Sequence, residues 1–205
     1  MENSGTPKWG DTVPFFNVSN PNDVSVEAVN AHLNYSASAI DTAPRSITNQ
    51  TSGALTSGTC FFTFFSPLVN LTVSEVSVGS GSTASAGLTY AAVGLYTFDG
   101  TTATLVARTA SDTTLFNSTN TLYTRSFDTA GDFPANYALV AGERYALGIL
   151  ITGTTAPTCV SGLFIPNTIN ALEPRLSGTA TGQTELPATR NTFTQTTTTP
   201  WGRFS

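Results

Sequence analysis

Residues 88–109 read LTYAAVGLYTFDGTTATLVART, and this stretch predicts two β-strands joined by a tight turn. The two expected strands, Leu88–Phe98 and Ala103–Thr109, flank the dipeptide Asp99-Gly100, which is followed by two threonines. A hairpin turn needs residues that tolerate a positive φ angle, and an Asp-Gly pair meets that need. We therefore expect an antiparallel hairpin, which favours an antiparallel β domain.

An aromatic run upstream of the hairpin predicts a strand that is buried on both faces. Within it, Phe62 and Phe64 fall on one face, whereas Phe61 and Phe65 fall on the other. Side chains alternate between the two faces of a strand, so apolar residues on both indicate that each face is covered. This strand is expected to lie inside the domain.

A turn at Ala141-Gly142 is expected to lead into another strand over residues 143–152. Gly148 in this strand and Gly94 in the hairpin leave room for an aromatic side chain of a neighbouring strand. The apolar residues of the strand recur at every second position and so share one face: Tyr145, Leu147, Ile149 and Ile151.

Composition agrees with a β domain. The chain has 205 residues, of which 40% are hydrophobic and only 10% are charged, against about 25% charged in an ordinary soluble domain. Low charge disfavours long exposed helices and suits strands with threonine on their wet faces. No helical pattern interleaves the strands, which excludes parallel βαβ units. We expect a mainly β, antiparallel, jelly-roll-like β-sandwich over residues 59–205, with residues 174–205 crossing it as edge strands.

The two cysteines, Cys60 and Cys159, lie in expected strands. A chain without a secretory leader is expected to be made in a cytosol, where two cysteines are more often buried free thiols than a disulfide. The sequence favours free thiols and leaves the pairing open. No metal-ligand spacing accompanies them, and no metal or cofactor is expected.

Residues 1–22 predict an extended arm, because proline and glycine recur and apolar periodicity is missing. The arm carries Trp9, Phe15 and Phe16, aromatic residues that a purely disordered leader would have little reason to contain. We interpret it as a docking arm that places these side chains in another protein. The alternative is an arm folded back on its own domain.

Residues 23–43 predict a short helix and the segment that ends it, and residues 44–58 predict a Ser/Thr/Gly-rich linker to the sandwich. A helical seam at three- and four-residue spacing favours parallel self-association, with a trimer preferred. Packing of the helix on its own sheet is the alternative. The seam residues are Val26, Val29, Leu33 and Ile40.

No catalytic centre is visible in the sequence. A hydrolytic triad needs a histidine beside its nucleophile, and the only histidine, His32, lies on the expected N-terminal helix. The carboxylates show no pairing of the kind that glycosidases need. We therefore expect a non-enzymatic protein.

Charge and hydropathy exclude two classes of partner. The net charge is −5, Lys8 is the only lysine, and the seven arginines are scattered. A nucleic-acid-binding protein shows a basic patch or stripe, so nucleic acid is not an expected partner. No apolar run approaches the roughly 20 residues that span a membrane, so membrane insertion is not expected either.

Surface aromatics could stack on sugars, and four tyrosines in or beside the expected strands are the candidates for contact with a host-surface glycan. The alternative is that most of them fill the core or rim of the sandwich. The four candidates are Tyr90, Tyr96, Tyr123 and Tyr137.

Several segments together resemble a β domain found in virion proteins of tailed bacteriophages. The resemblance spans about residues 60–205. The segments that carry it are Val93–Gly100, Leu105–Phe116, Tyr137–Gly148, Pro174–Gly178 and Pro200–Arg203. Such domains occur in minor tail proteins, fibres and head decorations, and no family site can be transferred to this chain.

The resemblance implies a viral structural protein of the virion, assembled in the host cytoplasm. Under this interpretation the arm attaches the protein to other virion proteins, the helix forms a homotrimer, and the β-sandwich is displayed. A tail protein is favoured, with a capsid decoration protein or head fibre as the nearest alternative. A carbohydrate-binding module for host attachment is a third expectation, which is compatible with either.

Overall fold

The computed structural model describes residues 38–162, 169 and 172–205, and these residues form a mainly β structure. Every pairing between its strands is antiparallel. The expected antiparallel β class is therefore confirmed.

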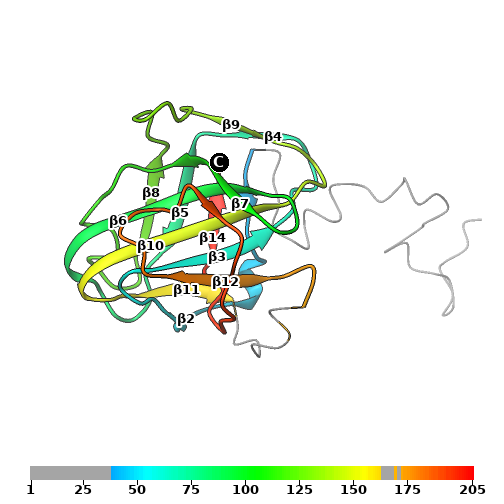
Figure 1. The fold of residues 1–205 in the computed structure, drawn as a ribbon. Helices are drawn as coiled ribbons and strands as arrows, with labels where there is room; N and C mark the ends of the chain where they lie inside the picture. Colours follow the sequence, from blue (N-terminus) through cyan, green and yellow to red (C-terminus); the bar gives the residue numbers. More distant parts are fainter. Residues whose placement is uncertain (1–37, 163–168, 170–171) are drawn as a thin grey trace, which may run out of the picture.

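The largest sheet has six strands in the order β12-β3-β10-β6-β7-β13. Figure 1 shows its long central strands, β6 in green and β10 in yellow, curving along one side of the molecule. Its strands are β3 (Thr59–Phe65), β6 (Ala86–Phe98), β7 (Ala103–Arg108), β10 (Tyr145–Thr155), β12 (Ser177–Thr181) and β13 (Thr189–Arg190).

A four-stranded sheet in the order β1-β14-β5-β8 packs against the inner face of the six-stranded sheet. Its strands are β1 (Ile40–Asp41), β5 (Glu75–Gly79), β8 (Leu122–Ser126) and β14 (Gly202–Phe204). Two small sheets pair β2 (Thr48–Ala54) with β11 (Thr158–Gly162) and β4 (Leu71–Val73) with β9 (Tyr137–Leu139), and a short 3-10 helix η1 (Arg45–Ile47) precedes β2. The two facing sheets make the β-sandwich that the sequence predicted.

The strand pattern of β3 is confirmed in detail. Phe61 and Phe65 belong to the core between the two sheets, whereas Phe62 and Phe64 belong to a second core on the outer face of the six-stranded sheet. The four apolar residues of β10 predicted to share a face all lie in the inner core. Strand periodicity alone therefore assigned these side chains to the correct layer.

The inner core is closed by the end of the chain. Phe204 in β14 is fully buried, and its ring stacks on that of Phe65 in β3 with centroids 5.5 Å apart. Two positions earlier in β14, a Cβ atom added to Gly202 would lie 2.8 Å from Leu147 Cδ2 in β10. Glycine is required there because the two sheets approach closely.

The outer core packs over two paired glycines, Gly94 in β6 and Gly148 in β10, which we call the glycine row. Gly148 in β10 pairs with Gly94 in β6 on one side and with Phe62 in β3 on the other. The buried ring of Tyr96 occupies the space above both glycines, as a Cβ on Gly148 would lie 2.5 Å from Tyr96 Cε2 and one on Gly94 would lie 2.9 Å from it. The prediction of room for an aromatic side chain of a neighbouring strand is confirmed for Gly148, whereas Tyr96 lies in the same strand as Gly94.

The C-terminal region covers this outer face. Phe193 packs edge-on against Phe62 and Phe64, with ring centroids 5.2 and 5.3 Å apart, and lies over Gly178 of β12. Leu186 is buried in the same core. Residues 182–199 thus provide apolar cover that the six-stranded sheet itself lacks.

The hairpin between β6 and β7 forms as predicted. Phe98 pairs with Ala103, and Gly100 has a φ angle of +100°. Asp99 Oδ1 accepts hydrogen bonds from the backbone N–H groups of Thr101 and Thr102, at 2.8 and 2.7 Å. These bonds hold the pKa of Asp99 below its usual value and fix the turn.

Two boundary predictions were wrong, and the edge-strand prediction for the C-terminal region was right only in part. The expected linker over residues 44–58 contains β2, which pairs with β11, so the β domain begins well before residue 59. Ile40, predicted on the helical seam, is a buried residue of β1 and pairs with Phe204. In the C-terminal region β12 and β13 are edge strands as expected, but β14 lies inside its sheet. In each case pairing with a strand far away in the sequence decided where a short segment lies, because its own residues have only a weak preference for strand structure.

Candidate functional site

Two of the four tyrosines proposed as glycan contacts are core residues. Tyr96 is fully buried in the outer core, with its ring edge-on to Phe62 at 5.1 Å. Tyr123 is buried in the inner core, and its hydroxyl accepts a hydrogen bond from the Ser118 N–H and donates one to Asn117 Oδ1. Neither ring presents a face to solvent, so the prediction that Tyr96 and Tyr123 contact a glycan was wrong.

The other two candidates, Tyr90 and Tyr137, are half-buried. The Tyr90 hydroxyl accepts a hydrogen bond from the backbone N–H of Leu186 at 3.3 Å. The Tyr137 ring packs edge-on against Tyr145, with centroids 6.3 Å apart. Partial burial raises the pKa of both phenols, so each remains a neutral hydroxyl near neutral pH.

A hollow of about 370 Å³ lies beside the Leu186 backbone that holds Tyr90. Strand β7 contributes Leu105 and Arg108 to it, and the segment 182–188 forms the opposite side. Phe133, from the loop before β9, completes the lining. The hollow therefore combines an apolar floor with a cationic side chain and a polar loop.

Arg108 is the central polar group of this hollow. Its guanidinium lies over the ring of Phe133, with the carbon 4.8 Å from the centroid, and its Nη2 donates a hydrogen bond to the carbonyl oxygen of Ala130 at 3.4 Å. The Nε atom is buried and has no hydrogen-bond partner. Arginine carries five N–H donors in a planar fork, and the Ala130 carbonyl oxygen accepts from one of them.

The rim of the hollow supplies further polar groups. Thr184 and Glu185 are exposed, and Gln183 is half-buried beside them. Ligand sites usually combine apolar walls with a few polar groups that orient the ligand. Planar guanidinium and carboxylate groups can bind adjacent hydroxyls on a sugar ring, and the aliphatic floor can accept the apolar face of that ring.

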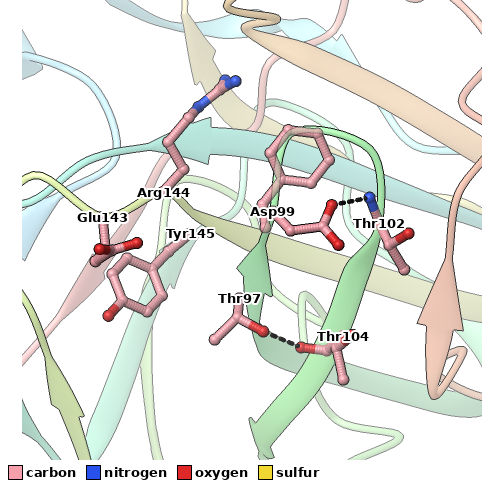
Figure 2. A pocket seen from close by; sticks show the side chains of 8 residues that line it. Thr97, Asp99, Thr102, Thr104, Glu143, Arg144 and Tyr145 are labelled. Atoms are coloured by element: carbon pink, nitrogen blue, oxygen red, sulfur yellow. Dashed lines mark hydrogen bonds between the residues drawn. The ribbon is translucent and has the colours of Figure 1, made fainter.

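A second hollow, of about 210 Å³, lies between the β6–β7 hairpin and the start of β10 (Figure 2). Most of its polar groups already have partners. Asp99 is used by the turn, and the Thr97 hydroxyl donates to the Thr104 carbonyl oxygen at 3.4 Å. Figure 2 shows the Arg144 side chain directed away from Asp99. Its guanidinium carbon lies 5.0 Å from the ring centroid of Phe98, and its Nη2 donates to the Arg175 carbonyl oxygen. We therefore assign these polar groups a structural role, not a role in ligand binding.

Several carboxylates of the described ranges form ion pairs with arginine. The contacts are Asp41 with Arg45 and Arg203, Asp112 with Arg125, and Glu173 with Arg144 and Arg175. Partial burial opposes ionisation of Asp112, but hydrogen bonds from Thr114 and Arg125 hold its pKa below the usual value. Within residues 38–162, 169 and 172–205, no group of three or more His, Cys, Asp or Glu side chains could hold a metal ion.

Both cysteines are buried free thiols, which confirms the alternative that the sequence favoured. Burial raises the pKa of Cys159 to about 12 and raises that of Cys60 still further above its usual value. A thiol reacts as its thiolate, so neither side chain has the character of a reactive nucleophile at neutral pH.

The remaining predicted site residues lie outside the described part of the chain. They are Trp9, Phe15 and Phe16 of the arm and Val26, Val29 and Leu33 of the seam. His32, for which no site role was expected, lies outside the described part as well. The residues of the larger hollow, by contrast, were not singled out from the sequence. Arg108 is one of several scattered arginines, and nothing local in the sequence links it to Phe133 or to residues 182–188.

No protein-family model matches the chain, and no curated protein matches its sequence. None of the described helical segments has the length and apolar character needed to cross a membrane.

Proposed function

We propose that this chain is a non-enzymatic structural component of a tailed-bacteriophage virion, attached through its N-terminal arm and displaying the β-sandwich. Tail association is favoured, and a capsid decoration protein or head fibre is the nearest alternative. The proposal builds on the sequence resemblance and on the arrangement of the domain.

The observation that best supports this proposal is the way the sandwich is completed. β1 and β14, from opposite ends of the described chain, lie side by side in the four-stranded sheet. The C-terminal region also covers the outer face of the other sheet, through Leu186 and Phe193. A domain closed in this way has both cores filled by residues that follow Ser38, and the proposal assigns attachment to the residues before it.

Deletion of residues 1–22 tests the attachment. In particles assembled with the truncated chain, we expect loss of incorporation, measured by immunoblot of purified virions. The purified truncated protein should retain the β-type circular dichroism and thermal unfolding of the full chain. A matched substitution on the sandwich, Leu122→Asp, should leave incorporation unchanged. Normal incorporation of the truncated chain would refute the docking arm.

The location within the virion requires a second measurement. Immunogold labelling with an antibody against the sandwich should place the protein on the tail. Labelling spread over the head would replace the tail assignment with a decoration or head-fibre role. Particles that lack the chain altogether would refute a virion function.

The larger hollow favours a second candidate function, a carbohydrate-binding module that contacts host-surface glycans. Its support is the combination of Arg108, Glu185 and the apolar floor beside Tyr90. On an array of bacterial envelope glycans, we expect binding that Arg108→Ala and Glu185→Gln both abolish. Thr104→Ala, in the second hollow, is the matched control and should bind as the wild type does. Equal binding by all variants would exclude this site.

A further inference from the structure

Large hydrophobic side chains are exposed at one end of the sandwich, within its connecting loops. Leu68 is 45% exposed, Val140 50%, Leu172 64% and Leu176 41%. We refer to these four residues as the end surface. Single exposed apolar residues need no explanation, but several on neighbouring loops indicate a contact surface.

Hydrogen bonds between backbones and side chains hold these loops together. The Gly142 N–H donates to the Pro67 carbonyl oxygen at 2.8 Å, and the Ala141 N–H donates to Asn70 Oδ1 at 2.8 Å. These bonds join the loop of Leu68 to the loop of Val140. On the other side, the Phe64 N–H donates to the Leu176 carbonyl oxygen at 3.0 Å. All three loops therefore meet where β3 ends and β10 begins.

The N-terminal part of the chain enters the sandwich at this same end. Ile40 in β1 pairs with Phe204, whose ring stacks on Phe65, the last residue of β3. The next residue after Phe204, Ser205, accepts hydrogen bonds from the N–H groups of Ser74 and Glu75, directly after β4. β4 pairs with β9, which precedes Val140. β1 and the end surface thus lie at the same end of the sandwich.

Few residues of the sequence lie between the seam and this entry point. The segment expected to be a linker, residues 44–58, follows β1 and contains η1 and β2. Leu33, the last seam residue before β1, is seven positions from Ile40, which is at most about 25 Å of extended chain. If Val26, Val29 and Leu33 associate between copies, the ends of their sandwiches are held within that reach of the seam.

Charge on these loops also permits close approach. Glu173 lies between Leu172 and Leu176 and forms ion pairs with both Arg144 and Arg175, at 3.7 and 3.6 Å. Its carboxylate is therefore compensated within the same copy. The Glu173 carboxylates of two such surfaces therefore do not repel one another as unpaired like charges would.

We infer that the end surface is the face through which the sandwich domains of neighbouring copies of this chain contact one another. This inference rests on the proposed association of the N-terminal helix. It adds that the oligomer is held by two elements, the helical seam and an apolar contact between the domains themselves.

The test compares variants of the full chain by analytical ultracentrifugation from nanomolar to micromolar concentration. Val140→Asp combined with Leu176→Asp changes the end surface. The matched control is Leu122→Asp, which alters a leucine that is 61% exposed and pairs with Gly79 at the other end of β5. Circular dichroism and thermal unfolding verify that each variant folds. A third variant, Leu33→Asp, disrupts the seam.

We expect an oligomeric wild type whose dissociation constant rises about a hundredfold in the end-surface variant, since each lost aliphatic contact weakens association by about tenfold. Leu122→Asp should leave the constant unchanged. An oligomer disrupted by Leu33→Asp but unaffected at the end surface would refute the domain contact and leave the helical association standing. A monomeric wild type would refute both.

Discussion

Gly148 offers the sharpest test of the packing described for the outer core. It lies in the middle of β10, between Phe62 of β3 and Gly94 of β6. A Cβ atom at this position would lie 2.5 Å from Tyr96 Cε2, whereas ordinary contact begins at 3.4 Å. The Tyr96 ring is fully buried and packs against Phe62, so it has no free space to move into.

We therefore expect Gly148→Ala to destabilise the domain. Overpacking of a tight core costs about 1 to 3 kcal/mol, and the reduced entropy of the unfolded chain offsets roughly 0.4 to 1 kcal/mol of that. A net loss of about 1 to 2 kcal/mol corresponds to a fall in Tm of about 2 to 8 °C for a domain of this size. Thermal unfolding followed by circular dichroism, with urea titration for the free energy, measures the effect.

The control is Gly162→Ala in β11. A Cβ there would meet Thr199 Cβ at 3.7 Å, an ordinary contact, so this variant should be neutral or slightly more stable. Shortening the ring with Tyr96→Leu should remove most of the penalty of Gly148→Ala, giving a coupling energy of at least about 1 kcal/mol in a double-mutant cycle. Wild-type stability of Gly148→Ala, or an equal loss in Gly162→Ala, would refute the proposed role of the glycine row.

Other regions of the domain give further predictions. Cys60 and Cys159 should resist a thiol reagent at pH 8 and react only after denaturation, because both are buried and have raised pKa values; rapid labelling of the native protein would contradict this. Asp112 has a lowered pKa, so its contribution to stability is present above the unfolded pKa, roughly 4, and is lost as the pH falls through the lower folded value. Unfolding of Asp112→Asn should accordingly depend less on pH between 5 and 2 than that of the wild type, and identical profiles would count against the Arg125 pairing. Phe193→Ala should lower the urea-derived free energy of unfolding by about 3 kcal/mol, the low end for loss of a phenylalanine ring, because this ring is partly buried where it covers the outer core; an unchanged free energy would show that Phe193 is not needed there.

The candidate site shows the limit of sequence interpretation more clearly than the fold does. Four tyrosines were predicted to contact glycans because aromatic rings can stack on sugars, but Tyr96 and Tyr123 are buried. An aromatic residue in a strand faces either solvent or core, and alternation cannot distinguish these when both faces of the sheet are covered. The larger hollow joins Arg108 in β7 to residues 182–188. No sequence pattern records a contact across such a separation.

The sequence by itself determined the antiparallel β class, the Asp99-Gly100 hairpin, the two faces of β3 and the space above Gly148. These features depend on the two-residue alternation of strands and on the backbone freedom of glycine, which are local properties. Only the tertiary structure decided that residues 48–54 form β2, that Ile40 joins β1, and that the last residues of the chain lie inside a sheet. Short polar or isolated segments have little intrinsic preference, so their conformation is fixed by hydrogen bonds and apolar burial supplied by strands far away in the sequence.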